Sequence, residues 1–346
     1  MDKPTPVDRR KFLNALGVTV GGAGLAGASL VAGPQLVKAA PEPPKGKIPD
    51  TPYRTGHMTF LTSAAAVLGE PSLKGHQLAA EEINAKGGLL GKRKIETITA
   101  DEAAGTDANV KELRRMKLEG KIDLFTGVIS SGNSPALGPV AEELGVLTIF
   151  TDGCTDFLFD KMKVATTLAL GVAPHAIGKD HPEGVLSGVH SNYYFTYPGG
   201  DRWPLNKAFV QRYYKRWNEY PNFQSEGAYV ALYMLKTAIE RANKLAGGWP
   251  EDEAIISQLE GLGMDTPSGY IYIRPDNHQG YKDAVTGFSK NLPNYPFATW
   301  DPDRVITIPI RNITAPANWP KPGKGHNEST AAADWIKKTW PKATTG

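Results

Sequence analysis

Short apolar runs alternate with longer amphipathic runs along residues 57–160 of this chain. The apolar runs have the length and composition of β-strands, and they fall at 57–63, 93–100, 122–128 and 146–150. Helical spacing of apolar residues occurs over 73–86 and 106–119, and a further helix is expected to include Pro135 in its first turn. Because a polar turn follows the strands, the pattern predicts a parallel α/β lobe whose ligand crevice lies at their carboxyl ends.

The second half of the chain has the same two kinds of element in a less regular order. Strands are expected at 164–172, 185–197, 270–274 and 305–313. Helices are expected at 205–217, 226–246 and 253–262. Together with a length of 346 residues, these elements predict two α/β domains.

One turn carries residue types that suit an anionic ligand. The turn at 130–134 has the sequence SSGNS and connects the strand at 122–128 with the next helix. Hydroxyl and backbone N–H groups at the amino terminus of a helix suit a carboxylate, because that end carries partial positive charge. The alternative is that these side chains only cap the helix, and the turn taken alone slightly favours that alternative.

Segments of the first half occur in an order and spacing that resemble a known family. They are GHQLAAEEINAKGGLLGKRKIE at 75–96, Asp101, IDLFTGVISSGNSPALGPVAEELGVLTI at 122–149 and TDGCT at 151–155. The block is similar to the first lobe of type I periplasmic solute-binding proteins of the branched-chain amino acid type, which serve ABC importers. The second half resembles the same family in PEGVLSG, LNKAFVQRYYKRW, GAYVALYMLKTAIERA and RPDNHQ. The resemblance implies an α/β fold of two lobes, with parallel sheets flanked by helices.

The resemblance also implies where a ligand binds. By this resemblance, the turns at 130–133 and 153–155 hold the carboxylate and amino groups of the ligand. Ser63 lies where the family lines its cleft, although an ordinary polar turn is the alternative. An aromatic ring from the helix at 226–246 would suit an apolar ligand tail, although core packing is the commoner fate of such residues. The predicted ligand-binding residues are Ser63, Ser130, Ser131, Gly132, Asn133, Gly153, Cys154, Thr155 and Tyr229.

Between its two halves the chain departs from the pattern of the family. The family continues after the segment near Phe159 with a strand, a helix, a strand and a helix, whereas here the chain runs almost directly into the strand expected at 164. We therefore expect a shortened second lobe, arising from a natural difference or from an internal deletion. The expected parts are a twin-arginine signal peptide (1–39), an extended lead-in (40–56), a first α/β lobe (57–160), a shortened second lobe with hinge crossings (161–300) and a C-terminal strand and tail (301–346).

The amino terminus has the pattern of an export signal. Arg9 and Arg10 precede a weakly apolar run rich in glycine and alanine, and small residues suit cleavage after Ala39. The paired arginines favour the twin-arginine export machinery and a periplasmic location, with an uncleaved membrane anchor as the alternative. Residues 1–39 carry the whole net charge of +3, so the basic pI gives no support for binding to nucleic acid.

Sequence motifs of catalysis and of metal binding are missing. The chain has no G-x-S-x-G, no P-loop and no H-E-x-x-H, and Cys154 is its single cysteine. We therefore predict no catalytic residue, no metal and no cofactor. The predicted function is capture of branched-chain amino acids or related small carboxylates, including amides and aromatic acids, for the membrane permease of an ABC importer. The alternatives are a module that presents ligand to a receptor, a truncated remnant that binds nothing, and an amide hydrolase that uses Ser131 or Cys154.

Overall fold

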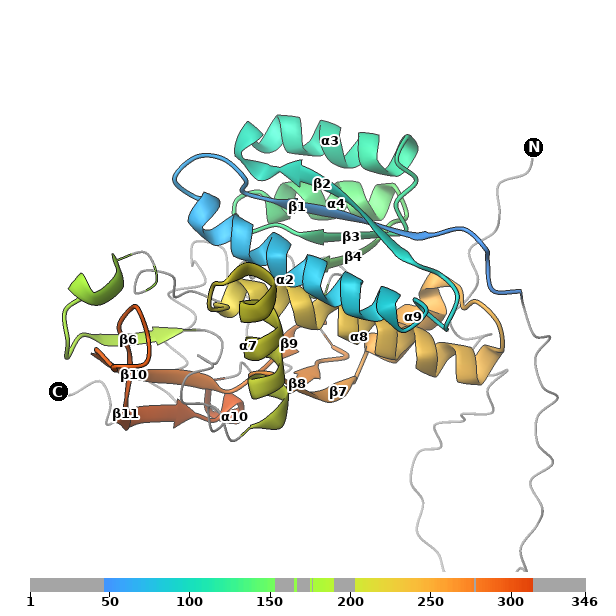
Figure 1. The fold of residues 1–346 in the computed structure, drawn as a ribbon. Helices are drawn as coiled ribbons and strands as arrows, with labels where there is room; N and C mark the ends of the chain where they lie inside the picture. Colours follow the sequence, from blue (N-terminus) through green and yellow to red (C-terminus); the bar gives the residue numbers. More distant parts are fainter. Residues whose placement is uncertain are drawn as a thin grey trace, which may run out of the picture. The chain divides into compact units, whose positions relative to one another are not determined.

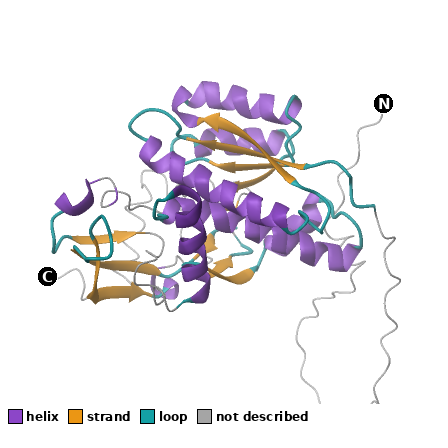
Figure 2. Cartoon of the chain, in the orientation of Figure 1, coloured by secondary structure: helices purple, strands orange, loops and turns teal. Residues whose placement is uncertain are grey.

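The computed structural model describes residues 47–152, 165–166, 175, 177–189, 203–276 and 278–313 (Figures 1 and 2). The expected signal peptide, the turn at 153–155 and most of the strand expected at 164–172 lie outside these residues. Within the described ranges, every helix is too short or too polar to cross a lipid bilayer.

Five parallel strands form the first sheet. In spatial order they are β2 (Ile95–Asp101), β1 (Tyr53–Thr59), β3 (Leu124–Gly127), β4 (Leu147–Phe150) and β5 (Ala165–Thr166). Each neighbouring pair runs parallel. The parallel sheet that the strand and helix pattern predicted for the first half is therefore confirmed.

Neighbouring residues of the strands face two different layers of helices. The helices are α2 (Ala66–Ala85), α3 (Thr106–Leu118), α4 (Ser134–Glu143) and α8 (Phe223–Ala246). Phe125 and Phe150 pack into a core with α3 and α4, whereas Leu124 and Ile149 pack into a core with α2 and α8. Successive side chains of a strand point to opposite faces, so both faces of the sheet are covered, as a parallel sheet requires.

Helices from the second half of the chain pack against the first sheet. They are α7 (Pro204–Trp217), α8 and α9 (Asp252–Leu259), which share the core of α2. α2 and α8 run along each other, and a Cβ added at Gly75 would lie only 1.9 Å from the carbonyl oxygen of Ser225 (Figure 1). α8 begins with a capping box, in which the side chains of Asn222 and Ser225 each accept a hydrogen bond from the backbone N–H of the other. The start of α8 is therefore held in a defined place beside α2.

The described strands after β5 pair antiparallel. They are β6 (Leu186–Val189), β7 (Gly263–Thr266), β8 (Gly269–Ile273), β9 (Gly280–Tyr281), β10 (Ala284–Lys290) and β11 (Thr299–Ile308), followed by the short helix α10 (Ile310–Ile313). One sheet has the order β11-β10-β6 and the other the order β7-β8-β9. Only Pro267 and Ser268 connect β7 to β8, whereas a parallel crossover needs a dozen or more residues. The expectation of parallel pairing therefore holds for the first sheet and not for these two.

Element boundaries differ from the predicted ones where local signals mislead. β1 begins at Tyr53, four residues earlier than expected, because its first residues pair with β2. α2 begins at Ala66 and continues through Pro71, although the proline cannot donate a helical hydrogen bond. Thr106 is the first residue of α3, and its hydroxyl donates a hydrogen bond to the side chain of Asn133 at 2.7 Å. Side-chain partners that are distant in sequence decide these details.

Candidate functional site

The strand order reverses at β1, and a ligand crevice is expected at this reversal. The chain leads from β1 to β2 on one side and returns to β3 on the other side of β1. In open parallel sheets, such a switch point opens a crevice at the carboxyl ends of the two strands. The loop with Ser63 leaves β1 at this edge, and the turn at 130–133 leaves β3. The structure therefore brings these two predicted elements to the same edge of the sheet.

A buried carboxylate supports the turn after β3. Glu102, which follows β2 directly, is 1% exposed and accepts hydrogen bonds from the backbone N–H groups of Ile129 at 2.8 Å and Ser130 at 2.9 Å. The side-chain amide of Asn133 donates to the same carboxylate at 3.0 Å. Burial raises the pKa of Glu102, and the three hydrogen bonds offset only part of that effect. Sequence reasoning missed Glu102, although its position beside Asp101 at the end of a strand was an available signal.

Ser131 and Gly132 are the exposed part of the turn, whereas Ser130 and Asn133 maintain its shape. The Ser130 hydroxyl accepts hydrogen bonds from the backbone N–H groups of Gly132 at 3.2 Å and Asn133 at 3.3 Å. Asn133 is buried and its side chain makes no capping hydrogen bond to α4. Helix capping alone therefore does not account for the polar side chains of this turn. The Asn133 side chain instead donates a hydrogen bond to Glu102 and accepts one from Thr106.

Ser63 lies exposed in the loop between β1 and α2, with a φ of 67°. Its hydroxyl accepts a hydrogen bond from the backbone N–H of Ala65 at 3.3 Å. Asp101 supports the same loop, because it accepts hydrogen bonds from the backbone N–H of Leu61 and the hydroxyl of Thr62. Ser63 therefore lies at the edge of the sheet where the crevice is expected, in a loop whose base is fixed by the end of β2.

The end of β4 contacts the start of α8. Asp152 is buried and accepts a hydrogen bond of 2.6 Å from the side-chain amide of Gln224. Gly153, Cys154 and Thr155 follow Asp152 and lie outside the described residues, so their role in binding stays a prediction.

Tyr229 lies in a helix interface. Its side chain is 6% exposed, and its hydroxyl donates to Glu82 at 2.8 Å and accepts from Arg212 at 2.9 Å. Tyr233 donates to the same carboxylate at 2.6 Å. Glu82 belongs to the last turn of α2, about 24 Å along the helix axis from its first residue at 1.5 Å per residue. The structure therefore does not bring Tyr229 together with the loops at the crevice.

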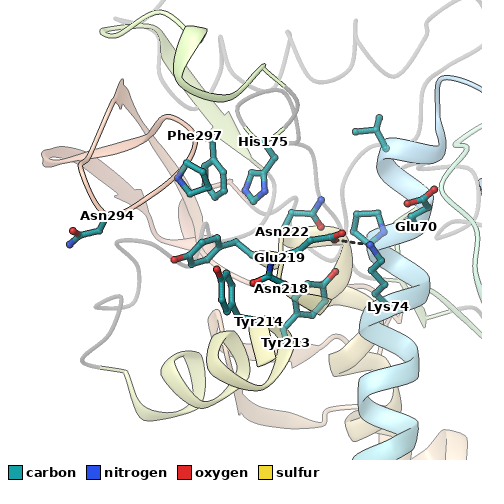
Figure 3. A pocket seen from close by; sticks show the side chains of 14 residues that line it. Glu70, Lys74, His175, Tyr213, Tyr214, Asn218, Glu219, Asn222, Asn294 and Phe297 are labelled. Carbon is teal, nitrogen blue, oxygen red and sulfur yellow. Dashed lines mark hydrogen bonds and ion pairs between the residues drawn. The ribbon is translucent and has the colours of Figure 1, made fainter. Parts of the chain in front are cut away.

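A cavity of about 570 Å³ lies beside the first turns of α2 (Figure 3). Its wall includes Glu70 and Lys74 from α2, Tyr213 and Tyr214 from the end of α7, and Phe297 from the segment before β11. This volume is within the range of small-molecule pockets. Sequence reasoning did not find the cavity, because its wall combines four segments that are far apart in the chain. The aromatic-rich segments YYKRWNEY and NYPF were the only local signal.

Comparisons with known proteins agree on one family. A family model described as periplasmic binding protein matches residues 52–157 and 152–287. The Leu/Ile/Val-binding protein homolog 7 of Brucella suis is 34% identical over 93 residues, which are 27% of this chain and 23% of the relative. An amino acid binding protein of Pseudomonas aeruginosa is 31% identical over 127 residues, 37% of this chain and 32% of the relative. The matched segments thus span about a quarter to a third of these curated relatives.

Solved structures with the same fold cover most of the chain. A branched-chain amino acid ABC transporter protein of Rhodopseudomonas palustris has a TM-score of 0.61 at 19% identity, covering 78% of this chain and 100% of that one. A solute-binding protein of another R. palustris strain, in complex with 3,4-dihydroxy benzoic acid, has a TM-score of 0.59 at 15% identity, covering 77% and 100%. A leucine-binding protein of Thermotoga maritima has a TM-score of 0.61 at 16% identity, covering 75% and 99%. The family match extends over more than half of the chain, so the chain belongs to the periplasmic binding protein family, with the α/β fold of its type I members.

Proposed function

We propose that the protein is the solute-binding component of an ABC importer and captures a small carboxylate at the crevice beside Ser131. The observation that carries this proposal is the turn after β3, where Ser131 and Gly132 are exposed at the amino terminus of α4. A carboxylate there accepts a hydrogen bond from the Ser131 hydroxyl and interacts with the partial positive charge of the helix end.

Glu102 restricts how a ligand uses this turn. The N–H groups of Ile129 and Ser130 already donate to Glu102, and that of Gly132 donates to the Ser130 hydroxyl, so ligand contacts fall on Ser131. The negative charge of Glu102 repels a ligand carboxylate. Because the pKa of Glu102 is raised, its neutral form is favoured relative to a free carboxyl group, and this repulsion is weaker. A zwitterion brings its own ammonium group beside the two carboxylates. An amino acid therefore suits the site better than a simple anion.

The names of similar proteins support the ligand class. The Brucella relative is named for leucine, isoleucine and valine, and one similar R. palustris structure holds 3,4-dihydroxy benzoic acid. Each of these ligands carries a carboxylate. We assign branched-chain amino acids as the first class to test, with related amides and aromatic acids as the alternatives.

The proposed organisation follows the expected parts of the chain, with residues 57–160 as the first lobe and 161–300 as a shortened second lobe. The family match comes in two pieces that meet at 152–157, which supports an interruption close to residue 160. Because α7, α8 and α9 pack on the first sheet, the chain crosses back to the first lobe within 161–300. We propose that 301–346 forms the C-terminal strand and tail.

The proposed location is the periplasm, after export by the twin-arginine machinery and cleavage near Ala39. Replacement of Arg9 and Arg10 by lysine is expected to retain the uncleaved precursor in the cytoplasm, whereas the control Lys3→Arg is processed normally. Cell fractionation and the mass of the product measure this. Processing of the double variant at the normal rate would contradict the proposed route.

Ligand binding is tested by thermal unfolding of the purified protein with a panel of branched-chain amino acids, their amides and small aromatic acids. A ligand at a hundredfold excess over its dissociation constant stabilises the native state by about 2.7 kcal/mol. Ser131→Ala is expected to weaken binding about tenfold, the effect of losing a hydrogen bond to a charged group. The exposed control Ser257→Ala on α9 is expected to bind normally. If no member of the panel shifts the midpoint, the truncated-remnant alternative is favoured.

A further inference from the structure

The cavity beside α2 is separate from the proposed solute site. The turn at 130–133 and the loop residue Ser63 do not line it. Its residues come instead from α2, from the end of α7 and the segment that joins it to α8, and from the segment before β11, together with His175 (Figure 3).

Aromatic rings form much of the cavity wall. Tyr214 and Tyr220 have ring centroids 4.9 Å apart, and Tyr220 meets Phe297 edge-on at 5.7 Å. His175 stacks on Phe297 at 3.9 Å. Burial lowers the pKa of His175 to about 4, so this ring is neutral at pH 7 and brings no positive charge.

Carboxylates outnumber cations among the described residues of the wall. Glu70 and Glu219 are the acidic residues, and Lys74 is the one basic side chain. The Lys74 ammonium is paired with Glu219 at 2.7 Å, as Figure 3 shows. Burial raises the pKa of Tyr213, and the charges of Glu219 and Glu70 raise it further. The electrostatic potential at the Tyr213 hydroxyl is therefore made more negative by these two carboxylates.

We propose that this cavity binds a small organic cation, an ammonium compound with apolar substituents. Aromatic faces attract a cation through their quadrupole, and the carboxylate of Glu70 supplies the opposite charge. Lys74 is the one cation among the described residues of the wall, and Glu219 already engages it, so an organic anion has no comparable partner there. This site goes beyond the proposed solute capture, and it does not depend on it.

The test compares choline with 3,3-dimethylbutan-1-ol, a neutral molecule of nearly the same shape. Calorimetric titration of the purified protein is expected to show saturable binding of choline, and binding at least tenfold weaker for the neutral alcohol. Equal binding of the two would show a merely apolar pocket, tighter binding of benzoate would show an anion site, and no binding of choline would also overturn the proposal.

Matched variants locate the site. Tyr214→Ala is expected to weaken choline binding about threefold to thirtyfold, the range of a cation–π contact, whereas Tyr270→Ala at an exposed position of β8 leaves it unchanged. Glu70→Gln is expected to weaken it about twofold to fivefold, and the exposed control Glu142→Gln is expected to have no effect. Circular dichroism confirms that each variant is folded.

Ser131→Ala separates the two sites. This variant is expected to weaken solute binding and to leave choline binding unchanged. Loss of both activities in Ser131→Ala would place choline at the solute crevice and overturn the separate cation site. If the unmodified protein binds choline but none of the carboxylates of the panel, the cation site is supported and the proposed solute capture is contradicted.

Discussion

His57 on β1 and His76 on α2 lie against each other in the core, with ring centroids 4.5 Å apart. Both are fully buried, and Nε2 of His76 is within hydrogen-bond distance of the hydroxyls of Thr55 and Thr97. Within the described structure, the Nδ1 atoms of both rings have no hydrogen-bond partner. Burial lowers the pKa of His76 to about 3, and burial together with the neighbouring ring lowers that of His57. The strand and the helix are therefore joined through two neutral imidazoles.

This pair predicts a loss of stability in mild acid. Each histidine binds a proton more readily in the unfolded chain, where its pKa is near 6.5, so the free energy of unfolding falls as the pH drops below that value. The expected slope is about 1.4 kcal/mol per pH unit for each histidine, continuing for His76 toward pH 3. Urea unfolding between pH 7.5 and 5 measures it. His76→Gln is expected to reduce the slope, and His278→Gln, which replaces a histidine outside this pair, is expected to keep it. A flat profile for the unmodified protein would contradict this assignment.

Gly75 is predicted to be intolerant of a side chain. Alanine there places a Cβ 1.9 Å from the backbone of Ser225, so α2 and α8 must separate. We expect a cost of about 1–3 kcal/mol in the free energy of unfolding, as for other overpacked cores. Gly132→Ala is the matched control, since among the described residues its Cβ meets only the Ser130 hydroxyl, at 3.5 Å. Similar denaturation midpoints for the two variants would contradict the close approach.

Glu102 is predicted to be essential for the shape of the turn after β3. Glu102→Ala leaves the buried N–H groups of Ile129 and Ser130 without their acceptor, at about 1–3 kcal/mol for each group. Glu102→Gln retains one acceptor oxygen and is expected to cost less. Ligand affinity should fall together with stability in both variants, and Glu142→Ala on the surface of α4 provides the control. Unchanged solute affinity in a folded Glu102→Ala protein would separate the turn from the site.

A buried ion pair is predicted to stabilise the start of α8. Lys282 lies 2.6 Å from Glu226, and both side chains are less than a tenth exposed. Lys282→Met leaves a buried carboxylate without its partner, which typically costs about 3–5 kcal/mol. Lys290→Met, which breaks a more exposed pair with Asp301, is expected to cost less than about 1 kcal/mol. Equal losses in the two variants, measured by urea denaturation, would argue against this difference.

Local periodicity predicted most of the elements, because buried apolar residues recur about every 3.6 positions in a helix and every second position in a strand. Leu124 and Phe125 illustrate this, since they face opposite layers of helices, and Pro135 lies in the first turn of α4 as expected. Features that depend on distant partners could not be predicted. Pro71 was expected to precede a helix, and it lies inside α2, where the surrounding packing maintains the helix.

The candidate site follows the same division. Ser63 and the turn at 130–133 each follow a strand that the sequence pattern predicts, and parallel pairing brings the ends of these strands to one edge of the sheet. The hydrogen bond from the Ile129 N–H to Glu102 joins residues 27 positions apart, and no local sequence pattern predicts such a contact. The ring contact of Tyr220 with Phe297 likewise arises only when the segment between α7 and α8 meets the segment before β11.

The hydrogen bonds of Glu102 have a consequence for the thermodynamics of capture. When a loop becomes ordered only on binding, the conformational entropy that it loses makes the free energy of binding less favourable. Here an internal carboxylate fixes the backbone of the turn when the protein folds. If a mutation removes the hydrogen bonds of Glu102, the turn becomes ordered only when ligand binds. Binding is then expected to be more exothermic and less favourable in entropy, even where the contacts of the bound ligand remain the same.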